Sequence, residues 1–201
     1  MAASIIILTG KAEWPFLRDV LKEQSPELRV AWAPNGQELE YTCGGQDVST
    51  ARLISFCSSV IVRPEILALF HGPAYNFHPG PPSFPGVNPA NFAIYEGATR
   101  FGATAHVMTP EIDCGPLVGV DWFDIPDCIN SQRLEEQAFS HLFKLFTNLA
   151  PALVDIDNAL PIRNEGWSGR RRTIKEFEAL SQPLIPISDE ELRLRKRALG
   201  I

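Results

Sequence analysis

The chain has 201 residues, of which 45% are hydrophobic and 21% are charged, and its net charge is −6 at pH 7. This balance is typical of a globular protein and allows one domain with a substantial core. The acidic charge argues against a nucleic-acid partner, because phosphate binding requires a basic surface. No apolar run reaches the roughly 18 residues of a membrane span, and the N-terminus lacks the basic start of a signal sequence. We therefore expect a cytoplasmic protein without a membrane partner.

The cysteines do not indicate a metal site. None of the four forms a Cys-x-x-Cys pair, and His-Glu-x-x-His is absent, so we predict no bound metal. Cys114 follows Asp113 directly and could be a nucleophile, but no second acid–base pair is left to activate its thiol. We therefore interpret Cys114 as a small residue packed in a turn.

The first third of the chain reads as alternating strands and helices. Apolar runs predict strands at 5–8, 28–33 and 51–56, and apolar residues at helical spacing predict a helix at 14–22. Pro34-Asn35-Gly36 is a turn signal. The polar, glycine-containing stretch 37–50 predicts a loop with at most one short strand.

The rest of the chain alternates in the same way and ends in a more polar tail. We predict short helices at 64–70 and 89–96 and strands at 74–77, 101–108 and 117–123. A long helix should begin at Asn130 or Ser131 and carry an apolar stripe to Leu153, with a kink or an end at Pro151. Two short helices follow, at 173–180 and 190–198. This order indicates an α/β fold with a partly parallel sheet, a catalytic domain over 1–159 and a helical tail over 160–201, packed on the domain or on a partner.

Three polar side chains stand at the ends of predicted strands. Asn76 and His78 lie two residues apart before a loop rich in proline and glycine, and Asp113 precedes Cys-Gly-Pro. Taken singly, such residues are usually turn formers or local caps. Together they supply an amide donor, an imidazole and a carboxylate, which are the groups needed to move a carbonyl carbon between two nitrogens.

Three motifs carry a resemblance to a known family. They are Asn76–Pro79, Gly102–His106 and Asp113–Pro116, the last beginning seven residues after His106. Over about Ala51 to Phe123 the chain resembles the 10-formyltetrahydrofolate-dependent formyltransferases. That family includes glycinamide ribonucleotide, methionyl-tRNA and nucleotide-sugar formyltransferases. The resemblance implies an open, twisted, largely parallel sheet with helices on both faces, here with a shortened N-terminal half.

The resemblance also implies roles for particular residues. Asn76, His78 and Asp113 would be catalytic: the amide and a protonated imidazole would donate to the oxyanion, and Asp113 would orient His78, raise its pKa and take a proton from the amine. The co-substrate would be 10-formyltetrahydrofolate, held in a mostly apolar slot. Val60, Ile61, Leu67, Val107 and Ile112 could wall that slot. The predicted folate-binding residues are Phe56, Ser58, Val60, Ile61, His106, Pro110, Glu111 and Ile112.

The chain departs from two branches of the family. The loop Thr9–Glu13 lacks the Gly-Ser-x-Ser-Asn run that holds a ribose phosphate in glycinamide ribonucleotide formyltransferase, and too few residues follow Pro116 for a tRNA-binding barrel. We therefore expect a small-molecule amine acceptor, with a nucleotide-linked amino sugar first by elimination. Arg170–Arg172 could meet a diphosphate, although a solvated face or a partner contact is the more common use of such a run. A formyltetrahydrofolate hydrolase, a non-catalytic folate-binding or scaffold protein, and a homodimer are left open.

Overall fold

A computed structural model describes residues 4–182 and 186–201 of the chain. One six-stranded sheet has the order β2-β1-β3-β4-β5-β6. The strands are β1 Ser4–Leu8, β2 Arg29–Ala33, β3 Ala51–Phe56, β4 Tyr75–His78, β5 Arg100–Val107 and β6 Leu117–Asp124. The pairs β2-β1, β1-β3 and β3-β4 are parallel, and β4-β5 and β5-β6 are antiparallel. The predicted mixed, largely parallel α/β sheet is confirmed.

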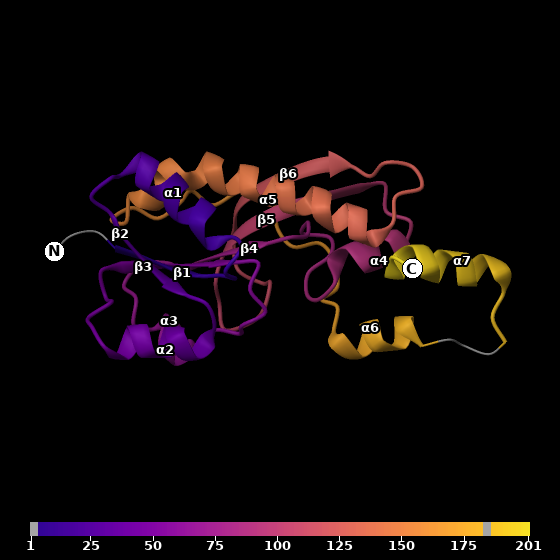
Figure 1. Ribbon diagram of the computed structural model, residues 1–201, viewed down its shortest axis with the longest axis horizontal. Coiled ribbons are helices and arrows are strands. Elements are labelled where there is room, and N and C mark those ends of the chain that lie inside the picture. Colours follow the sequence, from indigo (N-terminus) through magenta and orange to yellow (C-terminus); the bar gives the residue numbers. More distant parts are fainter. Residues whose placement is uncertain (1–3, 183–185) are drawn as a thin grey trace.

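Helices cover both faces of the parallel part (Figure 1). Helices α1 Trp14–Gln24 and α5 Ser131–Val154 lie on one face, and α2 Gly36–Gly44 and α3 Pro64–Leu67 lie on the other. Because successive side chains of a strand point to opposite faces, β1 serves both layers. Ile5 and Ile7 pack in the core with α1 and α5, whereas Ile6 and Leu8 pack in the core with α2.

Helix α2 corrects the prediction of a loop at 37–50. The Asn35 side chain accepts a hydrogen bond from the Glu38 N–H, so that Pro34-Asn35-Gly36 is a helix start rather than a simple turn. Leu39 and Cys43, four residues apart, are the buried face of the helix. The prediction was wrong because it weighed polar composition above an N-cap and an i, i+4 apolar pair. Helix α3 is also shorter than predicted and ends at Leu67.

The long helix α5 begins and ends through identifiable side chains. Asn130 caps it by accepting from the Arg133 N–H. Pro151 lies inside the helix, which continues to Val154, so the proline does not end it. The buried Arg52 guanidinium donates to the carbonyls of Ala152 and Leu153 at this end. A cation bonded to the last free carbonyls of a helix stabilises its terminus.

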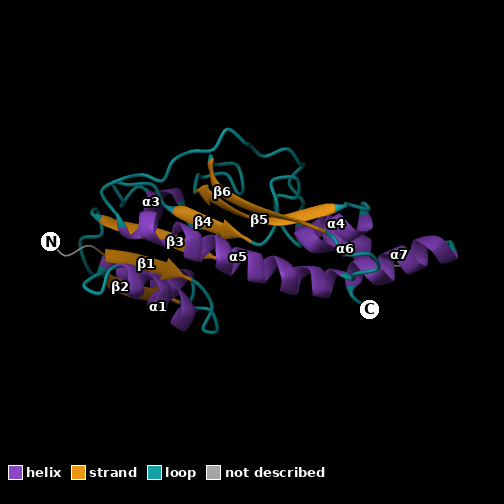
Figure 2. Cartoon of the chain, turned by 90° about the horizontal axis from the view of Figure 1, so that it is seen from above, coloured by secondary structure: helices purple, strands orange, loops and turns teal. Residues whose placement is uncertain are grey.

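The tail packs on the domain. Helix α6 Ile174–Ser181 starts with a capping box between Thr173 and Glu176. Helix α7 Asp189–Leu199 lies against α4 Pro89–Tyr95 (Figures 1 and 2), where the Asn91 amide donates to the Ala198 carbonyl at 2.8 Å. The division of the chain at residue 159 stays a prediction. Across the described ranges 4–182 and 186–201, no helix is both long and apolar enough to cross a membrane.

Candidate functional site

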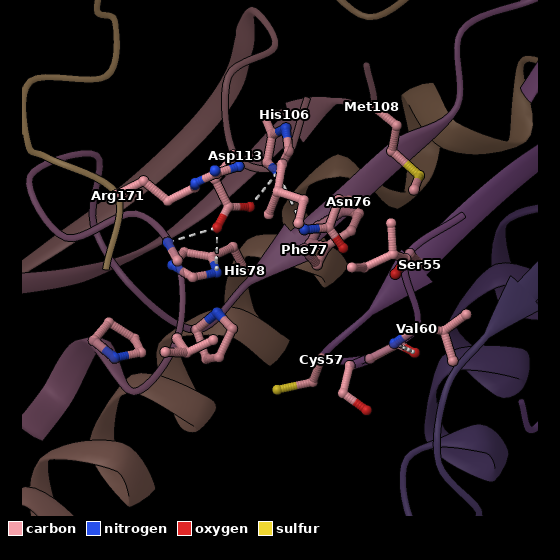
Figure 3. Close-up of a pocket in the computed structure, with 18 of the residues that line it drawn as sticks. Ser55, Cys57, Val60, Asn76, Phe77, His78, His106, Met108, Asp113 and Arg171 are labelled. Atoms are coloured by element: carbon pink, nitrogen blue, oxygen red, sulfur yellow. Dashed lines mark hydrogen bonds and ion pairs between the residues drawn. The ribbon is translucent and has the colours of Figure 1, made fainter. Parts of the chain in front are cut away.

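A cavity of about 740 Å³ opens beside the carboxyl ends of β3 and β4 (Figure 3). This edge of an open α/β sheet is where ligands commonly bind. Five parts of the chain line the cavity. They are 55 and 57–62 at the end of β3, 76–79 and 86–89 around the proline-rich loop, 106 in β5 with 108–113 after it, 135 and 139 in α5, and 171–174 in the tail. The cavity therefore joins the predicted folate slot to the three predicted catalytic residues.

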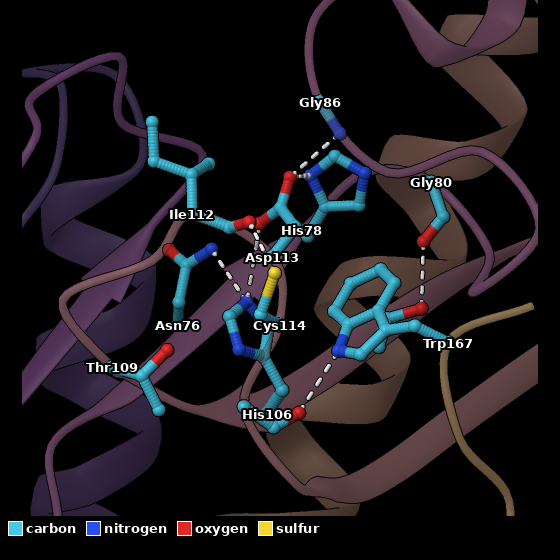
Figure 4. A network of polar contacts seen from close by, with 12 residues as sticks. Asn76, His78, Gly80, Gly86, His106, Thr109, Ile112, Asp113, Cys114 and Trp167 are labelled. Atoms are coloured by element: carbon cyan, nitrogen blue, oxygen red, sulfur yellow. Dashed lines mark hydrogen bonds and ion pairs between the residues drawn. The ribbon is translucent and has the colours of Figure 1, made fainter. Parts of the chain in front are cut away.

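The catalytic candidates form one polar cluster at the wall of this cavity (Figure 4). The Asn76 amide nitrogen lies 3.1 Å from His106 Nε2, and Asp113 Oδ1 lies 3.4 Å from the same nitrogen. Asp113 Oδ2 lies 3.7 Å from His78 Nδ1. His78 and Asp113 are each 7% exposed and His106 is 3% exposed. The structure thus brings the amide, both imidazoles and the carboxylate within reach of one point.

Strand register explains why three of these residues meet. Asn76 and His78 lie two apart on β4 and so share one face of the sheet. In the antiparallel β4-β5 pair, Asn76 is directly opposite His106 and His78 is opposite Thr104. Directly opposite side chains are close enough to interact. The Thr104 hydroxyl donates to the Gly80 carbonyl at 2.7 Å and fixes the start of the loop after His78.

Asp113 reaches the cluster from a tight turn. Its φ is 49°, in the left-handed region that Asp tolerates better than most residues. The Gly86 N–H donates to Asp113 Oδ2 at 2.8 Å. Gly86 itself has a φ of 95°, and a Cβ there would overlap the Arg172 carbonyl oxygen. The strained Asp113 and a glycine with positive φ therefore face each other across one hydrogen bond, and strained non-glycine residues are typical of functional sites.

Burial and local dipoles set the charges of the cluster. For Asp113, burial favours the neutral acid, but the His78 and His106 contacts and the Gly86 N–H outweigh it and lower its pKa to about 2. For His78, burial outweighs the attraction of Asp113 and lowers its pKa. Asp113 is therefore ionised and His78 neutral at neutral pH. Asp113 does raise the pKa of His78, as expected, but the desolvation of the buried ring is the larger effect, so the expectation of a protonated His78 is corrected.

The contacts of His106 connect its strand to the rest of the cluster. Nδ1 lies 2.9 Å from the Val107 carbonyl oxygen. Nε2 lies 3.1 Å from the Asn76 amide nitrogen and 3.4 Å from Asp113 Oδ1. The second N–H of that amide remains available to a ligand in the cavity, because an Asn side chain has two donors.

Most of the predicted folate-binding residues line the cavity, but Phe56 does not. Ser58, Val60, Ile61, His106, Pro110, Glu111 and Ile112 are at its surface. Phe56 is fully buried on the opposite face, packed among the aromatic rings of Phe77 and α5. Its neighbour Ser55 faces the cavity instead. Strand alternation could have given this assignment, since adjacent residues of β3 point to opposite faces. Leu67 and Val107, which we also considered as walls, pack in the two cores.

The tail contributes residues to the cavity that no local sequence motif indicates. Arg171, Arg172, Thr173 and Ile174 line the cavity. Arg170 and Arg172 form ion pairs with Glu176, and Arg172 also pairs with Glu96, whereas the Arg171 side chain extends to the cavity beside Asp113 (Figure 3). Glu135 and Phe139 of α5 are further lining residues without a local motif.

The cysteines and the possible metal ligands add no second chemistry. The Cys114 thiol is exposed and contacts the Ile112 carbonyl at 3.2 Å, and its pKa is raised. Burial raises the pKa of Cys57, which lines the cavity, to about 12. Neither thiol is activated as a nucleophile. Within the described part of the chain, no three His, Cys, Asp or Glu side chains are grouped to hold a metal ion.

The sequence of the central segment matches a family with known chemistry. Residues 50–141 match the formyl transferase family. Over 103 residues the chain is 34% identical to a methionyl-tRNA formyltransferase of a Nitratiruptor species. That match covers 51% of this chain and 32% of the relative, so the chain spans about a third of the curated relative's length.

Solved structures match the fold over nearly the whole chain. A sugar N-formyltransferase from a Shewanella species superposes with a TM-score of 0.79 and 18% identity, covering 99% of this chain and 88% of that one. An N-formyltransferase from Helicobacter canadensis, in complex with folinic acid and dTDP-3-aminofucose, superposes with a TM-score of 0.73 and 14% identity, covering 100% and 81%. The predicted formyltransferase resemblance and fold are confirmed.

Proposed function

We propose that this chain, which over residues 50–141 matches the formyl transferase family, transfers a formyl group from 10-formyltetrahydrofolate to the amine of a small acceptor. One observation carries the proposal: Asn76, His78 and Asp113 converge at the wall of a cavity large enough for a folate and part of an acceptor. Cavities of about 300–1,000 Å³ are typical of small-molecule sites.

Asn76 would stabilise the oxyanion. When the amine attacks the formyl carbon, the carbonyl oxygen becomes negatively charged. One Asn76 N–H is held by His106 Nε2, which fixes the plane of the amide, and the other can donate to this oxygen. A fixed donor aimed at developing charge contributes about 10²–10³ in rate.

His78 and Asp113 would move the proton. The attacking amine loses a proton as its bond to carbon forms, and a neutral His78 can accept it. The Asp113 carboxylate at 3.7 Å and the Phe84 carbonyl at 3.3 Å would stabilise the resulting imidazolium, because each ring nitrogen then faces an acceptor. When the oxyanion collapses and the bond to the folate N10 breaks, His78 returns the proton to N10. The products are a formamide and tetrahydrofolate.

The folate would occupy the slot between the segments 57–62 and 108–113. Val60, Ile61, Met108 and Ile112 give this slot apolar walls, and the backbone of Pro110 and Glu111 supplies polar groups. The Helicobacter canadensis neighbour, which shares this fold, is described with folinic acid bound. A pterin ring fits a site of this kind, with apolar walls and a few polar groups that fix its orientation.

The acceptor would approach from the side formed by the loop 86–89 and the tail segment 171–174. Arg171, in that tail segment, can bind an anion, and Glu135, which also lines the cavity, can bind an ammonium group. A nucleotide-linked amino sugar carries both an amine and a diphosphate. The neighbour from Helicobacter canadensis is described with dTDP-3-aminofucose, which is a nucleotide-linked amino sugar.

A product assay tests the proposed function. The chain is incubated with 10-formyltetrahydrofolate and a panel of dTDP- and UDP-linked amino sugars, and mass spectrometry measures the gain of a formyl group on the sugar. Tetrahydrofolate release without an amine is measured in parallel. We expect formamide product with at least one acceptor and slow release without an amine. Rapid release without an amine would identify a hydrolase, and binding of folate without turnover would identify a non-catalytic protein.

A further inference from the structure

The tail segment 163–172 runs as a strap across the back of the catalytic residues. Its start is bonded to β6, where the Arg163 N–H donates to the Leu117 carbonyl at 2.8 Å. Its middle is bonded to the proline-rich loop, where the Ser168 and Gly169 N–H groups both donate to the Pro82 carbonyl, at 3.1 and 3.2 Å. At its end, the Arg172 N–H donates to the Pro85 carbonyl at 2.9 Å. The strap is therefore held along its length by the elements that carry the site.

Two glycines show how closely the strap and the loop approach. A Cβ added to Gly169 would overlap the Ser83 carbonyl oxygen, and a Cβ added to Gly86 would overlap the Arg172 carbonyl oxygen. Gly86 and Arg172 also form a parallel β-bridge. Contact of backbone with backbone leaves little freedom for either segment. Because Gly86 donates to Asp113, a shift of the strap would be transmitted to the carboxylate.

Trp167 is the side chain by which the strap touches the catalytic cluster (Figure 4). Its indole ring is 5.1 Å from the His106 ring at an interplanar angle of 82°, and 6.0 Å from the His78 ring at 67°. Its indole N–H donates to the Gly115 carbonyl at 2.9 Å. One side chain therefore contacts both histidines edge to face and bonds to the turn that carries Asp113.

We propose that Trp167 is a positioning residue of the active site, and that the strap 163–172 completes a site whose catalytic residues all lie within the family-matched segment 50–141. The inference deepens the proposed function and rests on it for the meaning of the catalytic cluster. The ring closes the rear of His78 and His106 and keeps water from their nitrogens. The bond to Gly115 holds the Asp113 turn in its left-handed conformation.

The physical reason is the small tolerance of the cluster. His106 Nε2 meets the Asn76 amide at 3.1 Å and Asp113 Oδ1 at 3.4 Å, so a rotation of the imidazole would break the contact that orients the amide. Edge-to-face aromatic contacts restrain such a rotation. A displacement of about 1 Å in a catalytic group can cost about 10²-fold in rate.

Matched variants separate the two contacts of Trp167. Trp167→Phe keeps an aromatic edge and loses the bond to Gly115, and Trp167→Leu loses both. Trp122→Phe is the control, because the Trp122 indole also donates to the strap, to Glu165 Oε1 at 2.9 Å, but its ring lies against the Arg100 guanidinium, 5.1 Å away, instead of against His78 and His106. We expect kcat to fall about 10–100-fold in Trp167→Leu and less in Trp167→Phe, with KM for the folate unchanged. Trp122→Phe should retain the wild-type kcat.

An NMR measurement on the ligand-free protein tests the same inference without turnover. The indole ring should displace the Hε1 resonances of His78 and His106 through its ring current. Trp167→Leu should move both resonances, Trp167→Phe should move them less, and Trp122→Phe should leave them in place. Circular dichroism melting reports whether each variant is folded, and Trp167→Phe serves if the leucine variant does not fold.

The outcomes are distinguishable. Unmoved histidine resonances in a folded Trp167 variant would overturn the positioning role, as would a wild-type kcat in Trp167→Leu. If Trp122→Phe lowers kcat as much as the Trp167 variants do, Trp167 only stabilises the tail. That result would also overturn the positioning role. If the wild-type chain formylates no amine, the proposed function fails, while the resonances still decide whether Trp167 holds the two histidines.

Discussion

The antiparallel strands β4 and β5 and the tail contribute to the site in different ways. Strands β4 and β5 place Asn76, His78 and His106 by register alone, since the residues are opposite or two apart on paired strands. The tail contributes mainly through backbone hydrogen bonds, close glycine contacts and one indole ring. The comparison shows that the chemistry of a site can be local in sequence while its geometry depends on a distant segment. The predictions that follow test each side of this difference.

The largest expected effect belongs to Asp113. Asp113→Asn removes the charge that stabilises protonated His78 but keeps the shape of the side chain, and we expect at least about 100-fold loss in transfer rate. The control is Asp121→Asn, because Asp121 pairs with His141 and Lys144 on the surface of β6 and α5. Steady-state kinetics measure both variants. Near-normal turnover in Asp113→Asn would remove the carboxylate from the mechanism.

Asn76→Ala should lower turnover by about as much as Asp113→Asn does. The variant loses the N–H donor for the oxyanion, so kcat should fall about 10²-fold. Folate affinity should change little, because the slot residues remain in place. Titration calorimetry with 5-formyltetrahydrofolate measures affinity separately from turnover. A loss of about 10²-fold in folate affinity with unchanged kcat would show that Asn76 only binds the folate.

Gly86→Ala tests the contact between the proline-rich loop and the strap 163–172, and Gly97→Ala is its control. Both glycines have positive φ, but a Cβ at Gly97 meets open space whereas one at Gly86 meets the Arg172 backbone. We expect Gly97→Ala to lose about 1 kcal/mol of unfolding free energy through its φ alone. Gly86→Ala should lose about 1–3 kcal/mol more through the clash and should also lower kcat. Urea unfolding and kinetics measure these effects, and equal losses in the two variants would show that the strap can move aside.

The smallest expected effect is the pH dependence of stability. Because the folded pKa of Asp113 is depressed to about 2, its ionisation stabilises the fold above the unfolded pKa of about 3.9, and this contribution disappears as the pH falls toward 2. Its size is about 2 kcal/mol. Urea unfolding at pH 5 and at pH 2.5 should therefore show a smaller pH-dependent loss in Asp113→Asn than in the wild type. Identical losses would show that the carboxyl group titrates normally in the fold.

The sequence predicts the contribution of strands β4 and β5 to the site better than that of the tail. Most strands and helices were accessible from apolar periodicity. The motifs and the resemblance that they carry supplied the meeting of Asn76, His78 and Asp113 and the predicted folate-binding residues, of which seven of eight line the cavity. Phe56 was predicted to face the cavity, but its neighbour Ser55 does so and Phe56 is buried on the other face of β3. Helix α2 was not predicted, because its N-cap was interpreted as a turn. The lowered pKa of His78 could not be predicted, because it depends on the burial of the ring in the folded chain. Trp167 and the strap could not be predicted either, since their contacts are with distant backbone.

A crystal structure with 5-formyltetrahydrofolate tests the central claim most directly. We predict that the pterin lies between the segments 57–62 and 108–113, and that the formyl group lies within hydrogen-bond reach of the Asn76 amide and beside His78. Folate bound elsewhere, or a formyl group turned away from the Asn76 amide and His78, would contradict the proposed function.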